Sequence, residues 1–266
     1  MKIAIIGVGN LGKSMAKGLL LNNSMETLYL TKRNTESLKD FEENPKVSIT
    51  SNNIEAVKES DILIFAVQPA HINAVLQEVA PFITKKHLII SVITGYLLSD
   101  MEKILGIDQP IIRAMPNTAI AVGKSMTCIC FNDIGEKQFD IAKSIFNSLG
   151  TSISIPEEQM QAATVVCASG IAFWMRLIRA STQAAIQLGF DAKEAQELAM
   201  HTCEGAASLL ISTGNHPEQE IDKVTTPKGC TIEGLNEMEH KGLSSSLIQG
   251  MVTSFQKINA IKKEQL

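Results

Sequence analysis

Three glycines near the start of the chain have the spacing that a bound pyrophosphate requires. Gly7, Gly9 and Gly12 follow the apolar run at residues 3–6 and form the pattern G-x-G-x-x-G. The first glycine of such a pattern permits a tight strand-to-helix turn, the second leaves room for a pyrophosphate, and the third lets helix and strand pack closely. The helical pattern at residues 11–21 then directs its free N–H groups at the phosphates. This stretch predicts a dinucleotide-binding turn.

The end of the next predicted strand, at residues 27–31, indicates which dinucleotide binds. A NAD-binding turn usually has an Asp or Glu at this place, about 20 residues beyond the glycines. This chain has Lys32, Arg33 and Asn34 instead. Lysine and arginine pair well with a 2′-phosphate, and arginine does so with forked hydrogen bonds. We therefore expect NADPH, with NADH as the alternative. If neither side chain binds cofactor, they form a solvated basic pair at a strand end.

Two more polar segments follow apolar strands, namely Ala66-Val-Gln-Pro69 and Arg113-Ala-Met-Pro-Asn-Thr118. Both are expected at the carboxyl ends of parallel strands, where ligands bind in doubly wound sheets. The predicted cofactor-binding residues are Gly7, Gly9, Asn10, Leu11, Gly12, Lys32, Arg33, Asn34, Ala66, Val67, Gln68, Pro69, Met115, Pro116 and Asn117.

A third segment whose residues could bind a ligand lies near the end of the chain. Residues 224–234 read Val-Thr-Thr-Pro-Lys-Gly-Cys-Thr-Ile-Glu-Gly. A cluster of threonine, proline and glycine that opens a helix offers free N–H groups and hydroxyl donors. The segment therefore predicts an anion-binding site.

The first half of the chain alternates short apolar runs with helical patterns. The predicted strands are residues 2–7, 27–31, 47–50, 62–67, 87–92, 111–114, 125–131 and 152–155. The helical patterns are residues 11–21, 35–43, 53–59, 72–79, 98–105 and 136–149. This alternation implies an α/β fold with βαβ units and a mostly parallel sheet. The runs at 62–67 and 88–92 lack polar alternation, as expected where helices cover both faces of the sheet.

After Ile155 the pattern becomes helical. Helices are predicted at residues 157–188, 192–212, 232–240 and 244–258, with a short piece that ends at Val224. Pro156 suits a first helical turn, whereas Gly189 is expected to end the long helix and Asp191 to cap the next. We therefore expect a dinucleotide-binding domain at residues 1–155 and an all-α domain at residues 156–266.

The predicted helix at residues 157–188 is apolar on nearly all sides. Such a helix must be buried, and a domain of about a hundred residues cannot easily cover it alone. A subunit interface is the simplest solution, in a homodimer or a higher oligomer built from dimers. The alternative is a self-contained helical bundle.

The composition narrows the class of partner. The 266 residues are 45% hydrophobic and 20% charged, with a net charge of −4. These values are ordinary for a globular protein and argue against nucleic acid as the main partner. The histidines share no metal-ligand spacing with one another or with the cysteines, so no metal site is expected.

The five cysteines and the start of the chain indicate the cellular compartment of the protein. No C-x-x-C pair is present, which predicts reduced thiols in the cytosol, and Cys128 and Cys130 are expected to be packed rather than redox-active. The chain passes from Met1 directly into a strand, which leaves no room for a signal peptide. We expect no apolar run of this sequence to reach transmembrane length. We expect a cytoplasmic protein without a membrane partner.

Together these motifs resemble the pyrroline-5-carboxylate reductase family, and the resemblance covers nearly the whole chain. Gly7-Val-Gly-Asn-Leu-Gly12 resembles the family start G-x-G-N-M-G, and Arg113-Ala-Met-Pro-Asn-Thr118 matches R-x-M-P-N-T. Val224-Thr-Thr-Pro-Lys-Gly-Cys-Thr231 resembles the family signature V-[ST]-S-P-G-G-[TA]-T. The resemblance implies an N-terminal Rossmann-type domain and an all-α C-terminal domain that dimerises and often builds larger rings.

The resemblance also implies an activity, the NADPH-dependent reduction of 1-pyrroline-5-carboxylate to L-proline. The N–H groups of residues 228–231 and the Thr226 hydroxyl would then hold the substrate carboxylate. Thr231 would be the catalytic residue, with its hydroxyl near the imine nitrogen. The alternative for Thr231 is a capping role at the helix start. The predicted substrate-binding residues are Val224, Thr226, Lys228, Gly229, Cys230 and Thr231.

The chain departs from the family pattern at Gln68, Ile171, Phe173 and Lys228, where the family has Lys, Pro, Tyr and Gly. Three alternatives share the fold. One is a reductase for a different imine or carbonyl acid. Another is a β-hydroxyacid dehydrogenase, which places a catalytic lysine in the long interdomain helix, whereas residues 157–188 contain no lysine. The third is a reductase-like protein that binds a nucleotide or metabolite as a sensor, without turnover.

Overall fold

The computed structural model describes residues 1–23 and 25–265, and the side chains of residues 1–23 and 25–260. These residues form two compact units. One contains Met1–Ser169 together with the chain from Phe255 onward, and the other is Gly170–Ser254. Residues 156–169, which we assigned to the second domain, pack on the sheet of the first unit, where Met160 is fully enclosed in the core. The domain boundary after Ile155 itself stays a prediction.

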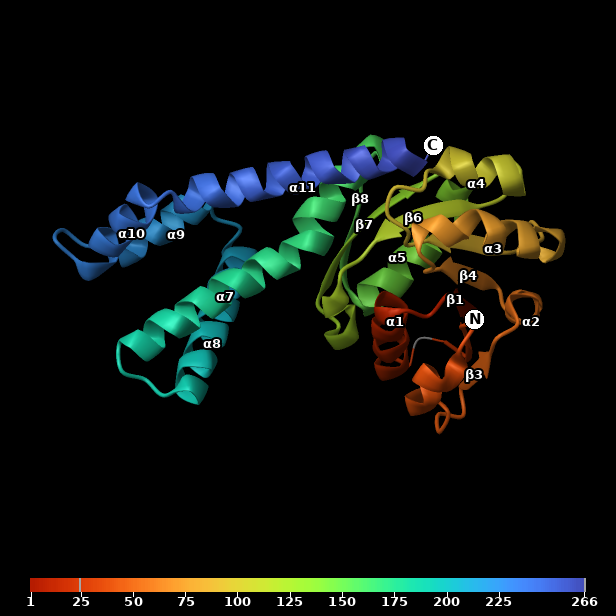
Figure 1. The fold of residues 1–266 in the computed structure, drawn as a ribbon, viewed down its shortest axis with the longest axis horizontal. Coiled ribbons are helices and arrows are strands. Elements are labelled where there is room, and N and C mark those ends of the chain that lie inside the picture. Colours follow the sequence, from red (N-terminus) through yellow and green to blue (C-terminus); the bar gives the residue numbers. More distant parts are fainter. Residues whose placement is uncertain (24, 266) are drawn as a thin grey trace. The chain divides into compact units, whose positions relative to one another are not determined.

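Within the described residues, eight strands form a single sheet in the first unit (Figure 1). They are β1 (Lys2–Ile6), β2 (Thr27–Thr31), β3 (Val47–Thr50), β4 (Ile62–Phe65), β5 (Leu88–Ser91), β6 (Ile111–Met115), β7 (Ser125–Phe131) and β8 (Gly150–Ser154). Their order is β3-β2-β1-β4-β5-β6-β7-β8. Neighbours from β3 to β6 run parallel, β7 is antiparallel to β6, and β8 is parallel to β7. The predicted mostly parallel sheet is confirmed.

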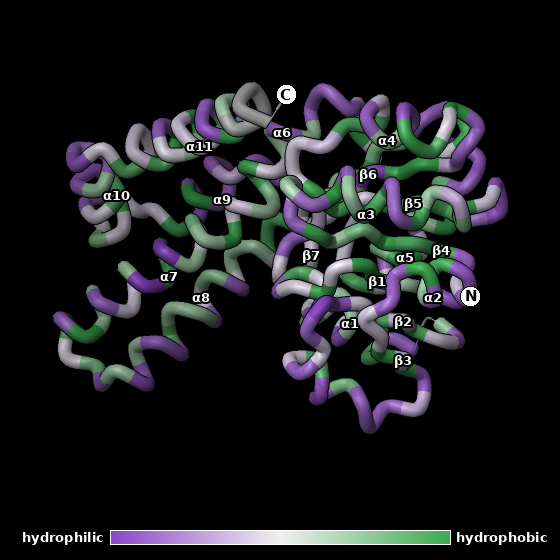
Figure 2. The backbone as a smooth tube through the Cα atoms, turned by 45° about the vertical axis from the view of Figure 1, so that its right-hand side comes forward, coloured by the Kyte–Doolittle hydropathy of each residue, from purple (hydrophilic) through white to green (hydrophobic). Residues whose placement is uncertain are grey.

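Helices cover both faces of this sheet because successive strand residues point to opposite sides. Ile3 and Ile5 of β1 pack on one side with α1 (Asn10–Leu21) and α5 (Phe139–Ser148). Ala4 and Ile6 pack on the other side with α2 (Asn53–Lys58), α3 (Ile72–Val79) and α4 (Leu98–Leu105), and with Met160. Figure 2 shows the central strands in green, which marks apolar residues. This burial on two sides explains the unbroken apolar runs of the sequence.

Two predicted helices of the first unit differ from the structure. Residues 35–43 form a 3-10 helix over Thr35–Phe41, and the turn before α5 is a 3-10 helix at Gly135–Gln138. The side chain of Asn34 caps the first of these by accepting a hydrogen bond from the Glu36 amide. Short segments of this kind commonly form 3-10 turns, and the apolar pattern does not distinguish them from α-helix.

The long apolar stretch after Ile155 is not one regular helix, and this prediction was wrong. It consists of a 3-10 turn at Glu157–Gln159, α6 (Met160–Ala163), a π-helical segment at Thr164–Ser169 and α7 (Gly170–Gln187). The main-chain carbonyl of Cys167 accepts a hydrogen bond from the Asn117 side chain at 3.2 Å. Such outside partners for the helical carbonyls are what permits a local break in the α-helical ladder.

The same stretch also corrects the expectation about apolar run length. Glu157–Gln187 is long and apolar enough to cross a membrane by length and composition. The amino-acid composition of a helix does not distinguish a membrane-spanning helix from a helix in a subunit interface, since both present apolar side chains on most sides.

The second unit is helical. After α7 come α8 (Ala192–Thr213), α9 (Pro217–Val224) and α10 (Cys230–His240). The last helix, α11 (Leu243–Gln265), begins in this unit and continues into the first. α7 and α8 pack side by side (Figure 1). The predicted cap at Asp191 is confirmed, since its carboxylate accepts hydrogen bonds from the amides of Lys193 and Glu194.

Candidate active site

The first glycine of the fingerprint lies in a turn that only glycine fits. Gly7 has a φ of +86°, a left-handed conformation that disfavours side chains. A Cβ built on Gly7 would lie 2.2 Å from Cγ1 of Val67, which follows β4. The amides of Gly7 and Val8 donate to the carbonyl of Thr31 at the end of β2, at 3.1 and 2.9 Å. The turn thus ties together the ends of β1, β2 and β4, where three of the predicted cofactor segments lie.

The other two glycines differ in their surroundings. A Cβ on Gly12 would touch Ile5 and Val8 at 3.4 Å, so this glycine serves the close packing of α1 on β1. A Cβ on Gly9 would meet no described atom within 4 Å. Gly9 precedes the first residue of α1, and no side chain caps that helix among the described residues. Open space in front of uncapped N–H groups is the arrangement that a pyrophosphate needs, so these residues fit a dinucleotide.

The end of β2 presents a basic and polar surface. Lys32 Nζ donates to Ser37 Oγ at 2.7 Å, which keeps the charge beside the β2 end. Arg33 is exposed. Asn34 Oδ1 accepts a hydrogen bond from the Glu36 amide at 3.0 Å. The side-chain oxygen of Asn34 therefore serves as a helix cap, and this bond does not use its NH2 group. Lys32, Arg33 and Asn34 therefore lie together at the end of β2, and the role of each in cofactor binding stays a prediction.

The segment after β4 continues the strand before it turns. The Ala66 amide donates to the Ile6 carbonyl at 2.9 Å, which extends the pairing of β1 and β4 by one residue. Ala66 and Val67 are partly buried, whereas Gln68 and Pro69 are exposed. The chain order reverses between β1 and β4, and this is the switch point where doubly wound sheets form their ligand crevice.

Asn117, at the end of β6, has a structural task that the sequence did not reveal. Met115 and Asn117 are buried. The Asn117 side chain accepts the Ala119 amide at 2.9 Å through Oδ1 and donates to the Cys167 carbonyl at 3.2 Å through Nδ2. Its own amide donates to Ser125 Oγ at 3.1 Å. These bonds hold the predicted cofactor residues Met115, Pro116 and Asn117 against β7 and the π-helical segment.

Arg113 is a second residue whose role sequence analysis missed. It lies on β6 with only 2% of its side chain exposed, and Nη1 contacts Glu157 Oε1 at 2.6 Å. The same carboxylate oxygen accepts the Leu98 amide at 2.8 Å. A buried charge needs a partner. An arginine within an apolar strand was therefore the sequence signal for a buried ion pair. The pair joins β6, the start of α4 and the turn before α6.

The predicted substrate-binding residues form one turn of the second unit, between α9 and α10. The Gly229 amide donates to the Thr226 carbonyl at 2.9 Å, and a Cβ on Gly229 would lie 2.4 Å from Thr226 Oγ1. Lys228 has a left-handed φ of 61°, which explains why the family pattern has glycine at this position.

This turn presents the start of α10 to its surroundings. Gly229 precedes the first residue of α10 and no described side chain caps the helix. Thr226, Lys228, Cys230 and Thr231 are exposed. The first amides of α10 and the nearby hydroxyls are therefore free of the helix's own hydrogen bonds, as the predicted anion site requires. Val224 is also exposed.

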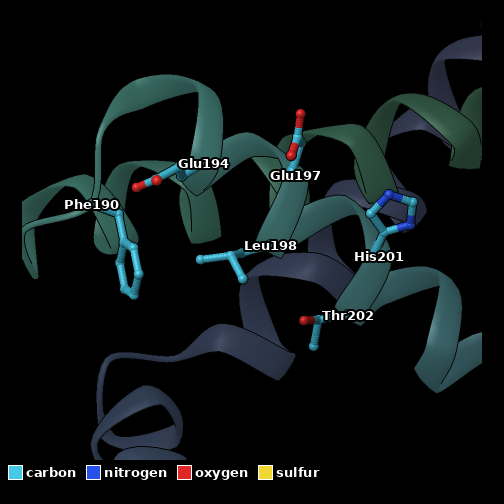
Figure 3. Close-up of a pocket in the computed structure, with 6 residues that line it drawn as sticks. All are labelled: Phe190, Glu194, Glu197, Leu198, His201 and Thr202. Carbon is cyan, nitrogen blue, oxygen red and sulfur yellow. The ribbon is translucent and has the colours of Figure 1, made fainter.

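A separate cavity of about 650 Å³ lies along α8 in the second unit (Figure 3). It is lined by Phe190, Glu194, Glu197, Leu198, His201 and Thr202. None of these residues belongs to the predicted site, and their carboxylates do not suit an anionic substrate.

Comparison with known proteins decides the family. Residues 157–261 match the family model described as pyrroline-5-carboxylate reductase dimerisation, and residues 2–95 match one described as NADP oxidoreductase, coenzyme F420-dependent. Pyrroline-5-carboxylate reductase 2 of Dictyostelium discoideum is 40% identical over 272 residues, which cover 96% of this chain and 91% of that protein. The chain belongs to the pyrroline-5-carboxylate reductase family.

Two further relatives are informative. Pyrroline-5-carboxylate reductase 1 of Dictyostelium discoideum is 43% identical over 96% of this chain, and the chain spans about half, 49%, of that longer relative. A crystal structure of Plasmodium falciparum pyrroline carboxylate reductase with NADP bound has a TM-score of 0.89 at 24% identity, with 98% of each chain covered. This second likeness shows the shared fold.

These comparisons confirm several predictions. The resemblance to this reductase family, the Rossmann-type domain followed by a helical region, and an NADP-type oxidoreductase are all borne out. The family model described as dimerisation covers residues 157–261, which include the apolar stretch Glu157–Gln187. This match supports a homo-oligomer, in which that stretch takes part.

Proposed function

We propose that this chain reduces 1-pyrroline-5-carboxylate to L-proline with NADPH, the last step of proline biosynthesis. The observation that carries the proposal is the turn at residues 226–231, where Gly229 and left-handed Lys228 present the uncapped start of α10. A carboxylate is the small anion that such a turn suits. Family membership and the glycine turn after β1 support the same activity.

The proposed cofactor site consists of the strand ends of the first unit. The amides at the start of α1, beside Gly9, bind the pyrophosphate, while Lys32 and Arg33 pair with the 2′-phosphate. Residues 66–69 and 115–117 line the cleft towards the nicotinamide. When bound, NADPH supplies the hydride, so the protein's own task is placement and electrostatics.

The proposed substrate site uses the amides of Lys228, Cys230 and Thr231 and the Thr226 hydroxyl to hold the carboxylate, because the Gly229 amide already donates to the Thr226 carbonyl. Thr231 directs its hydroxyl at the imine nitrogen. An iminium forms readily in water, so the substrate arrives protonated and the site needs no strong general acid. We also propose that the enzyme acts in the cytoplasm as a homodimer or a larger assembly of dimers. The match to a dimerisation model supports this assembly.

Replacing Thr231 tests the catalytic assignment. Thr231→Ala removes the hydroxyl and is expected to lower kcat/KM for 1-pyrroline-5-carboxylate by roughly 100- to 1000-fold, the usual effect of losing one transition-state donor. Thr231→Ser keeps the hydroxyl and serves as the matched control, with activity near that of the wild type. Full turnover by Thr231→Ala would reduce Thr231 to a residue of the helix start.

A second candidate keeps the fold and changes the substrate. It is favoured by Ile171 and Phe173, which replace the family's proline and tyrosine. A reductase of a different imine or carbonyl acid would show a higher kcat/KM for that compound than for 1-pyrroline-5-carboxylate in a side-by-side assay. A metabolite sensor would bind NADPH without oxidising it in the presence of either compound.

A further inference from the structure

Two cysteines of the first unit lie side by side. Cys128 is on β7 with 3% of its side chain exposed, and Cys167 is partly exposed in the π-helical segment. Their Sγ atoms are 3.8 Å apart. A disulfide bond is about 2.05 Å long, so the two sulfurs are in contact but not bonded.

The surrounding structure holds this pair in place. The Cys167 main-chain carbonyl accepts the Asn117 side chain, which fixes the π-helical segment next to β7. Cys128 is paired in register with Met115 of β6. Cys130 is on the same face of β7 two residues later, and it is 4% exposed. The thiol pair therefore lies directly behind the proposed cofactor segment 115–117.

The two thiols are chemically unequal. The hydrogen bond with Cys128 lowers the pKa of Cys167, although burial opposes this shift. The same hydrogen bond and burial raise the pKa of Cys128. Because the thiolate is the reactive form of cysteine, Cys167 is the nucleophile, and it is partly exposed in the single chain. Cys130 lacks such a partner among the described residues, and burial raises its pKa to about 12.

We propose that Cys128 and Cys167 are a reversible oxidation site that forms an intrachain disulfide with hydrogen peroxide. The Cys167 thiolate attacks one peroxide oxygen, the O–O bond breaks, and hydroxide leaves and takes up a proton to form water. The resulting sulfenic acid is attacked by Cys128, the S–O bond breaks, and a second water leaves. The two thiols lose two electrons in total, and one peroxide is reduced to two waters.

Peptide mapping of the full-length protein tests the proposal. Trypsin cleavage places Cys128 and Cys130 in the peptide 125–137 and Cys167 in the peptide 144–176. After peroxide treatment and alkylation, these two peptides are expected as one linked species, lighter than their sum by two hydrogens. Dithiothreitol is expected to separate them. Non-reducing electrophoresis is expected to show no new covalent dimer.

Two matched variants assign the sulfurs. Cys130→Ala is expected to keep the linked species, whereas Cys128→Ala loses it and leaves Cys167 to oxidise further. Fragmentation of the wild-type linked peptide gives the same assignment without any substitution. Free or separately oxidised cysteines in the peroxide-treated wild type, or a link that runs through Cys130, would overturn the proposal.

Discussion

The three glycines of the fingerprint have different surroundings in the structure. Gly7 combines a left-handed φ with a position against Val67, so a side chain there meets both strain and a steric clash. Gly12 is in ordinary packing contact with β1, and Gly9 faces open space. Substitution at Gly9 is therefore expected to affect NADPH binding with little effect on folding, whereas substitution at Gly7 is expected to affect both.

Gly9→Ala is predicted to weaken NADPH binding with little effect on folding. The added methyl meets no described protein atom, so we expect the free energy of unfolding to change by about 1 kcal/mol or less. We expect the Kd for NADPH, measured by fluorescence titration, to rise at least about tenfold, or 1.4 kcal/mol. Gly7→Ala is the contrasting variant and should lose stability as well. Wild-type affinity in Gly9→Ala would place the pyrophosphate elsewhere.

At the scale of single residues, some features of the site could be predicted from the sequence and others could not. The glycine spacing predicted Gly7, Gly9 and Gly12 correctly as the turn after the first strand, because a tight turn, a ligand approach and close helix packing each require glycine at that spacing. Lysine itself carries no signal for the left-handed φ at position 228, and the glycine of the family pattern at that position was the available sign of it. The Cys128–Cys167 pair was missed because contacts between residues 39 positions apart depend on tertiary packing. Cys128 was interpreted only as a packed strand residue.

At the scale of elements, the ion pair of Arg113 and Glu157 joins β6 to the first helical turn after the sheet. Arg113 is nearly fully buried and Glu157 also accepts the Leu98 amide. Loss of one partner would leave a buried charge, which is more costly than loss of the whole pair. This contact fixes where the segment that carries Cys167 begins.

Glu157→Gln is predicted to destabilise the protein by about 3 kcal/mol, because it leaves Arg113 buried without its counter-charge. Chemical denaturation followed by circular dichroism measures the change. Glu158→Gln is the matched control, since Glu158 is exposed and surface substitutions usually stay within about 0.5 kcal/mol. Equal stability of the two variants would show that the Arg113 pair does not stabilise the fold.

His87, which precedes β5, predicts a pH dependence of stability. It is buried, and Nδ1 accepts the Thr84 amide at 2.9 Å. Burial lowers the pKa of His87 below its ordinary value of 6.5. The unfolded chain therefore binds a proton at a pH where the folded state does not, so the free energy of unfolding falls as pH drops below 6.5. Unfolding curves between about pH 7.5 and 5.5 should show this fall, and His87→Gln should flatten it. An unchanged slope in His87→Gln would assign the effect to other groups.

The ends of the strands were predicted to within two residues, whereas the helical stretch after them was not predicted correctly. Apolar runs bounded by polar turns suffice for a strand that is covered on both sides, as β4 and β5 are. The π-helical segment Thr164–Ser169 has the same apolar pattern as an α-helix. It depends on Asn117, a residue far away in the sequence, which no local pattern includes.

At the scale of the whole molecule, the helical unit exposes large apolar side chains. Trp174 and Met175 of α7 and Leu209 and Ile211 of α8 are each about half or more exposed in the single chain. Together with the match to a dimerisation model, this surface supports assembly through the helical unit. Burial of such side chains between subunits is the usual driving force of an obligate interface.

Ile211→Glu is predicted to weaken the oligomer. Ile211 is 84% exposed in the single chain, and a charge in an apolar interface leaves an unpaired group. Light scattering after size exclusion should show a smaller species for this variant at micromolar concentration. Ile107→Glu in the first unit is the control, because Ile107 is 75% exposed and lies outside the helical unit. Equal masses for wild type and both variants would exclude Ile211 from the interface.

The central claim is hydride transfer from NADPH to a cyclic imine, and isotope transfer tests it most directly. The enzyme is incubated with 1-pyrroline-5-carboxylate and NADPH that carries deuterium at both positions of nicotinamide C4. We predict L-proline with one deuterium on the ring carbon next to nitrogen and remote from the carboxylate, formed in equal amount to NADP⁺. Unlabelled proline, or no NADP⁺ formed with this substrate, would contradict the account.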